Sequence, residues 1–174
     1  YAQTMNNNIM RWTVSGVRND STTSLQSFYW RDTLPTDAVR LTRLVTGTYS
    51  TTQTYKVTFT TNLNSQWRTA YDNLSTAKNY TLDMSSAALG LASNEYVTQF
   101  MLSFGIVPAG FHQLTNATVD AQTLYALTNG YKFTNKADVG GLLGGNWVQS
   151  IARWTTSIYS HYVPAKPAAP KSPK

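Results

Sequence analysis

The feature that most constrains the fold is a pair of alternating segments near the start of the chain, separated by a polar turn. In the first, Met10–Val17, apolar residues such as Trp12 alternate with polar ones, which is the period of two of a half-buried β-strand. The second, Leu25–Asp32, is rich in aromatic residues, and Arg18–Ser24 between them carries Asn, Asp, Ser and Thr. This pattern predicts a β-hairpin or a sheet-crossing strand pair that begins an antiparallel sandwich.

Further alternating segments continue the pattern. The clearest is Thr54–Thr61, where Tyr55 and Phe59 fall on one side while threonine and lysine fall on the other. Strands are also expected in Val39–Tyr49, Gln66–Tyr71, Tyr80–Met84, Glu95–Val107, Phe111–Leu114, Val119–Leu127 and Asn146–Tyr162. The predicted fold class is therefore an all-β, immunoglobulin-like antiparallel β-sandwich with at most one short helical turn, at Ser85–Leu91. Gly140–Gly145 predicts a flexible connection.

Three parts are expected along the chain. Residues 1–8 lead into the first strand, and residues 9–162 form the immunoglobulin-like sandwich. Residues 163–174 read V-P-A-K-P-A-A-P-K-S-P-K, and prolines spaced in this way favour an extended, solvated backbone. We therefore expect an extended spacer or tail after the sandwich.

The composition excludes several classes of function. The chain of 174 residues has no cysteine, which excludes disulfides, thiol catalysis and cysteine-ligated metal clusters. The formal net charge is +6, but the basic residues are dispersed, and Lys166, Lys171 and Lys174 lie in the last few positions. Because nucleic-acid-binding proteins usually have a dense basic stripe, no nucleic-acid partner is expected. No continuous apolar run has the length that a membrane span needs.

Several segments taken together resemble a domain of Firmicute (Gram-positive) cell-wall-anchored surface proteins. They include F-Y-W-R-D-T-L-P-T-D-A-V-R-L (Phe28–Leu41), L-G-L-A-S-N-E-Y-V-T-Q-F (Leu89–Phe100) and N-G-Y-K-F-T-N-K-A-D-V-G-G (Asn129–Gly141). The layout is also similar to the conserved-repeat immunoglobulin-like domains of bacterial adhesins, in which V-x-N, D-x-L-P and N-x-A-x-V sequences bracket the sandwich. Here these correspond to Val17–Asn19, Asp32–Pro35 and Asn135–Val139.

The resemblance implies a non-catalytic extracellular module of a bacterial cell-surface protein, acting as a stalk, a spacer or an adhesin domain. Its expected location is extracellular, at the cell wall or cell surface, and its expected partners are the neighbouring domains of a larger surface protein. No L-P-x-T-G sequence is present, so membrane or wall attachment is expected only through segments absent from this chain. Two alternatives stay open: a module that binds a carbohydrate or a host protein, and a pilus or fibre subunit.

Candidate catalytic and metal-binding residues are few. Asp32 and Asp37 flank Pro35, and we expect both to cap turns, where a carboxylate accepts hydrogen bonds from backbone N–H groups. The two histidines, His112 and His161, have no carboxylate cluster nearby in the sequence. No G-x-S-x-G sequence marks a serine nucleophile. We therefore predict no enzyme, no catalytic residue, no metal and no cofactor, and the sequence assigns no ligand-binding residue.

Two expectations concern the aromatic residues and the lysines. The aromatic side chains are predicted to fill the core rather than to form an exposed carbohydrate platform. Adhesin domains of this kind often carry a Lys–Asn isopeptide bond. The first strand has Arg11 and no lysine, Lys56 is expected to face solvent, and Lys132, Asn135 and Lys136 share one strand, so the sequence does not indicate such a crosslink.

Overall fold

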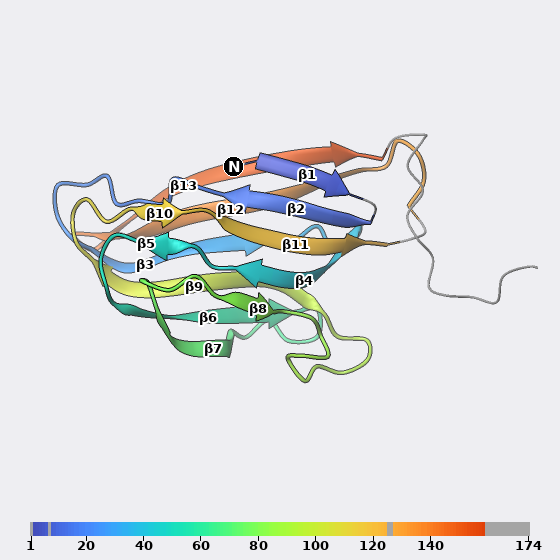
Figure 1. Cartoon of the computed structure of the whole chain (residues 1–174), viewed down its shortest axis with the longest axis horizontal. Coiled ribbons are helices and arrows are strands. Elements are labelled where there is room, and N and C mark those ends of the chain that lie inside the picture. The colour runs from blue at the N-terminus through green and yellow to red at the C-terminus, as the bar shows by residue number, and fades with distance from the viewer. Residues whose placement is uncertain (1, 7, 125–126, 159–174) are drawn as a thin grey trace, which may run out of the picture.

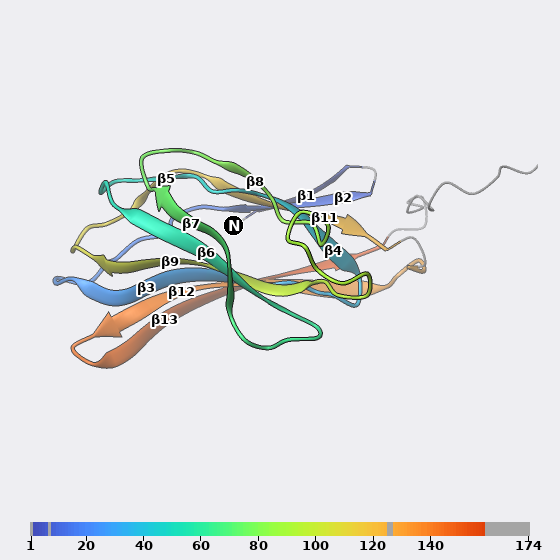
Figure 2. The same cartoon turned by 90° about the horizontal axis from the view of Figure 1, so that it is seen from below.

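The structure, a computed structural model, describes residues 2–6, 8–124 and 127–158. Two antiparallel sheets face each other with the hydrophobic core between them, as the two perpendicular views show (Figures 1 and 2). The predicted fold class, an all-β antiparallel sandwich of the immunoglobulin-like type, is confirmed. The predicted tail, residues 163–174, lies outside the described residues.

The sheets are built from strands that are far apart in the sequence. The first sheet has five strands in the order β1 (Ala2–Asn6), β2 (Ile9–Val14), β11 (Ala117–Thr123), β4 (Val39–Val45) and β8 (Thr81–Asp83). The second has six in the order β13 (Asn146–Ser157), β12 (Lys132–Leu143), β3 (Leu25–Thr33), β9 (Val97–Val107), β6 (Thr54–Thr61) and β7 (Arg68–Ser75). A two-stranded sheet joins β10 (Gln113–Thr115) and β5 (Thr48–Tyr49).

The opening strand pair crosses from one sheet to the other. Strand β2 belongs to the five-stranded sheet and β3 to the six-stranded sheet, so the sheet-crossing alternative holds and the hairpin alternative does not. The buried Asn19 fixes the crossing segment, since its side-chain amide donates hydrogen bonds to the carbonyl oxygens of Thr23 and Pro108, both at 3.0 Å. The polar turn predicted from Arg18–Ser24 therefore works as a bridge between the two layers.

The core is aromatic where the sequence predicted it. Trp12, Trp30, Phe59 and Phe104 are all buried on inward-facing positions of their strands. The indole Nε1 of Trp30 donates a hydrogen bond of 2.9 Å to the hydroxyl oxygen of Tyr49, whose own hydroxyl donates to the carbonyl of Thr46 at 2.8 Å. Burial removes the indole N–H of Trp30 and the hydroxyl of Tyr49 from water, and these two bonds supply the hydrogen-bond partners that water would have provided.

Three local predictions need correction or refinement. The segment predicted as a flexible connection is mostly strand, because β12 runs to Leu143 and only Gly144 and Gly145 form the hairpin turn, with positive φ angles of 56° and 85°. Residues 2–6 of the predicted lead-in form β1. Ser85–Leu91 forms turns with one hydrogen bond of helical spacing, from Leu89 N to Ser85 O at 3.1 Å, and the described residues contain no helix.

A buried carboxylate joins three strands on the outer face of the five-stranded sheet. Asp120 of β11 accepts hydrogen bonds from Arg11 of β2 at 2.7 and 2.9 Å and from Arg43 of β4 at 2.8 and 3.1 Å. Burial alone would raise the pKa of Asp120, but the hydrogen bonds and charges of the two arginines outweigh it, and the pKa lies below its ordinary value. The cluster ties the centre of this sheet together.

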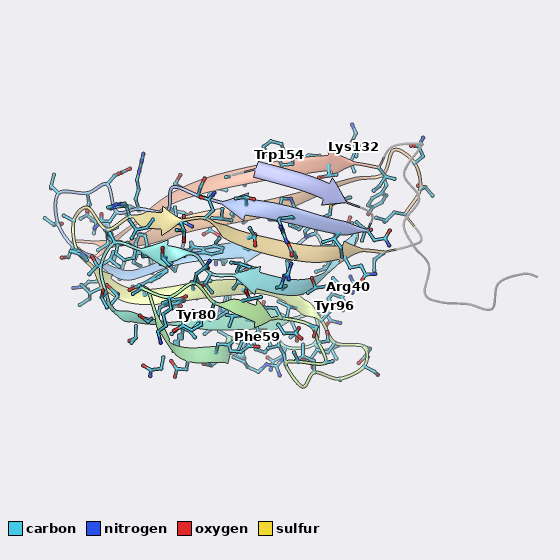
Figure 3. The ribbon with its side chains drawn as sticks, in the orientation of Figure 1. Arg40, Phe59, Tyr80, Tyr96, Lys132 and Trp154 are labelled. Carbon is cyan, nitrogen blue, oxygen red and sulfur yellow. The ribbon has the colours of Figure 1, made fainter. Side chains whose placement is uncertain are left out.

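A cation–π contact connects the end of the five-stranded sheet with the strand that follows Tyr96. The guanidinium carbon of Arg40, on β4, lies 3.7 Å from the centre of the Tyr96 ring (Figure 3). Arg40 Nη1 also donates a hydrogen bond of 2.6 Å to the carbonyl of Thr36. The contact fixes the loop before β9 against β4.

Candidate functional site

A groove of about 930 Å³ lies on the outer face of the six-stranded sheet. Trp30 and Leu102 point into the core, so their strand neighbours Tyr29, Arg31 and Ser103 face away from it and form the floor. Side chains from β13 line one side of the groove, and side chains from β7, at the opposite edge of the sheet, line the other. The groove therefore crosses the width of the sheet.

Irregular backbone shapes this face. Ser27, Asn73 and Gly105 all line the groove and all have positive φ, at 50°, 54° and 74°. The β3–β9 and β6–β7 ladders shift register close to these positions. Because bulges bend a strand and increase its twist, these irregularities account for a sheet that curves around the groove.

An aromatic pair forms the wall on the β13 side. The ring of Trp147 is 62% exposed and meets the ring of Tyr29 edge-on, with centroids 6.2 Å apart and an interplanar angle of 70°. Gly140 of β12 makes room for this pair, since a Cβ atom there would lie 3.3 Å from Tyr29 Cε1 and 2.5 Å from the carbonyl oxygen of Val148. The glycine thus allows the Tyr29 ring to lie across β12.

A hydrogen-bond network centred on Asp138 holds the polar groups of this wall in place. Arg31 donates to both carboxylate oxygens at 2.9 Å. The Tyr29 hydroxyl donates at 2.9 Å and Gln149 Nε2 at 2.7 Å, both to Oδ2. Arg31 also lies over the Tyr29 ring, with its guanidinium carbon 5.5 Å from the centroid. Each group in the network is therefore oriented before any ligand arrives.

The network also determines the ionisation of its members. Burial, the largest single influence on Asp138, would raise its pKa, but hydrogen bonds from Arg31, Gln149 and Tyr29 outweigh burial and hold the pKa below its ordinary value. The pKa of Tyr29 is raised, first by burial and then by its bond to the Asp138 carboxylate. Asp138 is therefore ionised, and both of its carboxylate oxygens already accept hydrogen bonds. A carboxylate held in this way is a poor general acid or base.

The remaining wall and floor carry polar groups of both charges. Lys56 of β6 and Asp72 of β7 both line the groove and are exposed. Asp72 Oδ1 accepts a hydrogen bond of 2.7 Å from the backbone N–H of Asn73. Met101 supplies apolar surface between them and the aromatic wall. Exposed rings beside oriented donors and acceptors can stack on the apolar face of a ring-shaped ligand while bonding to its hydroxyl groups.

The prediction that aromatic residues fill the core is wrong for three of the five tryptophans. Trp67, Trp147 and Trp154 are 39%, 62% and 41% exposed. The alternation of residues along β13 could not show which of its tryptophans are exposed. An edge strand that extends past the opposite sheet is exposed on both faces. Trp147 and Gln149, two residues apart on one face, were the available signal for the groove.

One of the two aspartates predicted to cap turns lies in a strand instead. Asp32 is fully buried within β3 and accepts a hydrogen bond of 2.8 Å from the side chain of Asn135, so that prediction is wrong. Asp37 accepts a hydrogen bond from the hydroxyl of Tyr131. Asp32 lies two residues after Trp30 on β3, so both side chains point into the core. The nearby Pro35 suggested a turn and hid this alternation in the sequence.

The structure describes one of the two histidines and the lysines considered above for a crosslink. His112 is exposed and forms an isolated bridge with Arg18, whereas His161 lies outside the described residues. Lys56 faces solvent as predicted. Asn135 is buried, while Lys132 is exposed and Lys136 half-buried on the same strand. The described residues contain no group of three or more His, Cys, Asp or Glu side chains arranged to hold a metal ion.

Comparison with protein-family models and with curated proteins finds no relative of this chain. No family model matches the chain, and no curated protein matches it either. The part of the chain that the structure describes has no helix of the length and hydropathy that crossing a membrane requires. Function is therefore inferred from the groove and from the resemblance of the sequence segments.

Proposed function

We propose that this chain is a non-catalytic adhesin module of an extracellular bacterial surface protein, and that it binds a neutral glycan in the groove of its six-stranded sheet. The surface location and the bacterial source rest on the resemblance of its segments to cell-wall-anchored proteins. The binding role rests on one observation: the exposed Trp147 stands beside a set of polar groups already oriented by Asp138. A simple spacer needs neither feature.

The chemistry of the groove favours an uncharged sugar. Arg31 of the lining is paired with the buried Asp138, and Lys56 and Asp72 of the lining carry opposite charges, so these four groups together carry no net charge. Sugars present an apolar ring face and several hydroxyl groups, which suit an exposed indole and a set of fixed donors and acceptors. A volume of about 930 Å³ accommodates more than one sugar ring.

Binding to a glycan array, followed by calorimetric titration of the strongest ligand, tests this function. We expect Trp147→Ala to weaken binding about tenfold, because stacking on an aromatic ring contributes about 1 kcal/mol or more beyond simple burial. The fold is expected to stay intact, since the Trp147 side chain is mostly exposed.

Trp67→Ala is the matched control. Trp67 is also partly exposed but does not line the groove, so its removal should leave the affinity unchanged. Equal affinities of the Trp147→Ala variant and the unmodified protein would show that the ligand binds elsewhere. An array without any bound glycan would reject a glycan-binding role.

A further inference from the structure

Strand β13 presents a long free edge. It pairs with β12 at every position from Asn146 to Ser157, and its other side has no partner strand among the described residues. From Asn146 to Arg153, such an edge offers unpaired N–H and C=O groups to an extended chain. It stands at one border of the molecule, where Figure 3 shows Trp154 and Lys132 on the β12–β13 hairpin.

Two other described edges, β7 and β8, are blunted in ways that β13 is not. At the far edge of the same sheet, β7 is broken by register shifts and by the positive φ of Asn73. In the other sheet, the edge strand β8 has three residues. Strand β13 has twelve residues, no proline or glycine, and Arg153 as its one charged residue. It thus lacks most of the features by which proteins prevent edge pairing.

Both faces of β13 carry exposed apolar side chains. Trp147 and Ile151 project from the outer face, Val148 and Trp154 from the inner face. On the inner side, cavities of about 300 and 150 Å³ separate β12 and β13 from the segment that follows β2, and Val139 and Ser150 line both of them. A strand added beside β13 would place alternate side chains next to these openings.

The charges near Arg153 indicate what such a strand would carry. Arg153 lies directly opposite Lys136 in the β12–β13 ladder, and like charges at directly opposed positions are unfavourable. Neither side chain forms an ion pair among the described residues. The next carboxylate along β12 on the same face, Asp138, is already bonded to Arg31. The pair lacks an acidic neighbour.

We propose that the free edge of β13 binds an extended, acidic segment of a partner protein by β-strand addition. The partner would place Asp or Glu beside Arg153 on the outer face and apolar side chains beside Val148 on the inner face. A second copy of this chain is a poorer occupant, because β13 itself has no acidic residue and each copy carries a formal net charge of +6. The edge adjoins the groove, which Trp147 and Gln149 of β13 line, but strand addition to it does not depend on the proposed glycan binding.

Two synthetic peptides with blocked termini test the proposal. One is Thr-Val-Thr-Val-Glu-Val-Thr-Val-Thr and the other carries Lys in place of Glu. We expect the unmodified protein to bind the Glu peptide about fivefold more tightly than the Lys peptide, as cross-strand pairs of opposite charge predict. The difference should shrink at high salt. Amide hydrogen exchange should slow in residues 146–157 and stay unchanged in β6.

Exchange of the charge provides the decisive comparison. Arg153→Glu should reverse the preference between the two peptides, and Arg153→Gln should reduce it, leaving only the weaker effect of the more distant Lys136. Both are exposed-site changes that should leave the circular dichroism spectrum intact. Lys78→Glu, an equal change of charge at an exposed turn residue away from β13, should leave the preference as in the unmodified protein.

Several outcomes would overturn the proposal. These are equal binding of the two peptides, an unchanged preference in Arg153→Glu, protection of amides outside residues 146–157, and no binding. Sedimentation of the protein alone tests the second-copy alternative: a dimer whose β13 amides are protected would replace the acidic partner with self-pairing.

Discussion

The carboxyl group of Asp32 is buried among side chains that give it little stabilisation in its charged form. Asp32 Oδ2 accepts one hydrogen bond from Asn135, and Oδ1 has no hydrogen-bond partner among the described residues. Burial is the main reason that the pKa of Asp32 is raised to about 7, with the negative charge of Asp138 adding to it, whereas the bond from Asn135 lowers it. The folded protein therefore holds this proton far more tightly than the unfolded chain does.

This raised pKa predicts how stability changes with pH. Between the ordinary pKa of an aspartate, about 4, and the folded-state pKa, the unfolded chain loses its proton and the folded protein keeps it, so the free energy of unfolding falls as pH rises. We expect Asp32→Asn to remove this fall and to stabilise the protein at about pH 8 by something on the order of 3 kcal/mol. Urea denaturation at about pH 5 and pH 8 measures both effects.

The exposed Asp20 provides the control for Asp32. Asp20→Asn removes one exposed carboxylate and leaves Asp32 in place, so the fall in stability assigned to Asp32 should remain. A profile of Asp32→Asn that runs parallel to that of the unmodified protein would mean that Asp32 ionises normally in the fold.

At the scale of elements, the packing of the β12–β13 hairpin depends on two glycines of β12. Gly140 and Gly141 lie inside the sheet, where the neighbouring backbone leaves no room for a side chain. At Gly140 the conflict is with the carbonyl oxygen of Val148 and with the Tyr29 ring, so a methyl group there would push β13 and the groove wall apart. The position of the aromatic wall therefore depends on a residue that has no side chain.

We expect Gly140→Ala to destabilise the protein by about 2 kcal/mol and to lower the affinity of the groove for its ligand, because overpacking moves both the hairpin and Tyr29. Gly110→Ala is the comparison: its φ is +80° but its surroundings are open, so only the backbone cost of about 1 kcal/mol should appear, without an effect on the groove. Thermal unfolding and ligand titration of both variants check this. A Gly140→Ala variant as stable as the unmodified protein would show that the hairpin shifts freely.

The elements differ in how far their sequences could predict them. Strands with one dry and one wet face, such as β2, were predictable because their alternation reports burial directly. The sequence placed Lys132, Asn135 and Lys136 on one strand. It did not extend β12 to Leu143, because Gly140 and Gly141 resemble a loop until their close neighbours are known. For the groove, the sequence offered only the spacing of Trp147 and Gln149 on one face of a strand. The rest depends on the register that places Tyr29, Asp138 and Gln149 side by side.

Over the whole molecule, each sheet has one buried aspartate on its outer face that joins strands distant in the sequence. Asp120 links β11 to β2 and β4, and Asp138 links β12 to β3 and β13. Both pKa values lie below the ordinary value. Their stabilising effect is therefore present above about pH 4 and is lost as pH falls through the folded-state pKa. Together with Asp32, they give the fold an optimum on the acidic side of neutrality.

We expect Asp120→Asn to lower the free energy of unfolding by about 1–3 kcal/mol at about pH 5, because two arginines lose a charged partner. The difference from the unmodified protein should shrink as pH falls from about 5 toward 2, since protonation of Asp120 removes the charge to which both arginines are bonded. Urea denaturation across this range measures it. A difference of equal size at both pH values would assign the effect to packing instead of charge.

The placement of β1 and β13 has a mechanical consequence. Both strands lie at one border of the sandwich, and their arrows point the same way in Figure 1. A pull on Ala2 and an opposite pull on Ser157 thus acts along the strands and loads the β1–β2 and β12–β13 ladders in shear. Many hydrogen bonds then share the force at once instead of opening one after another like a zipper. A domain loaded in this direction withstands tension far better than one that is peeled.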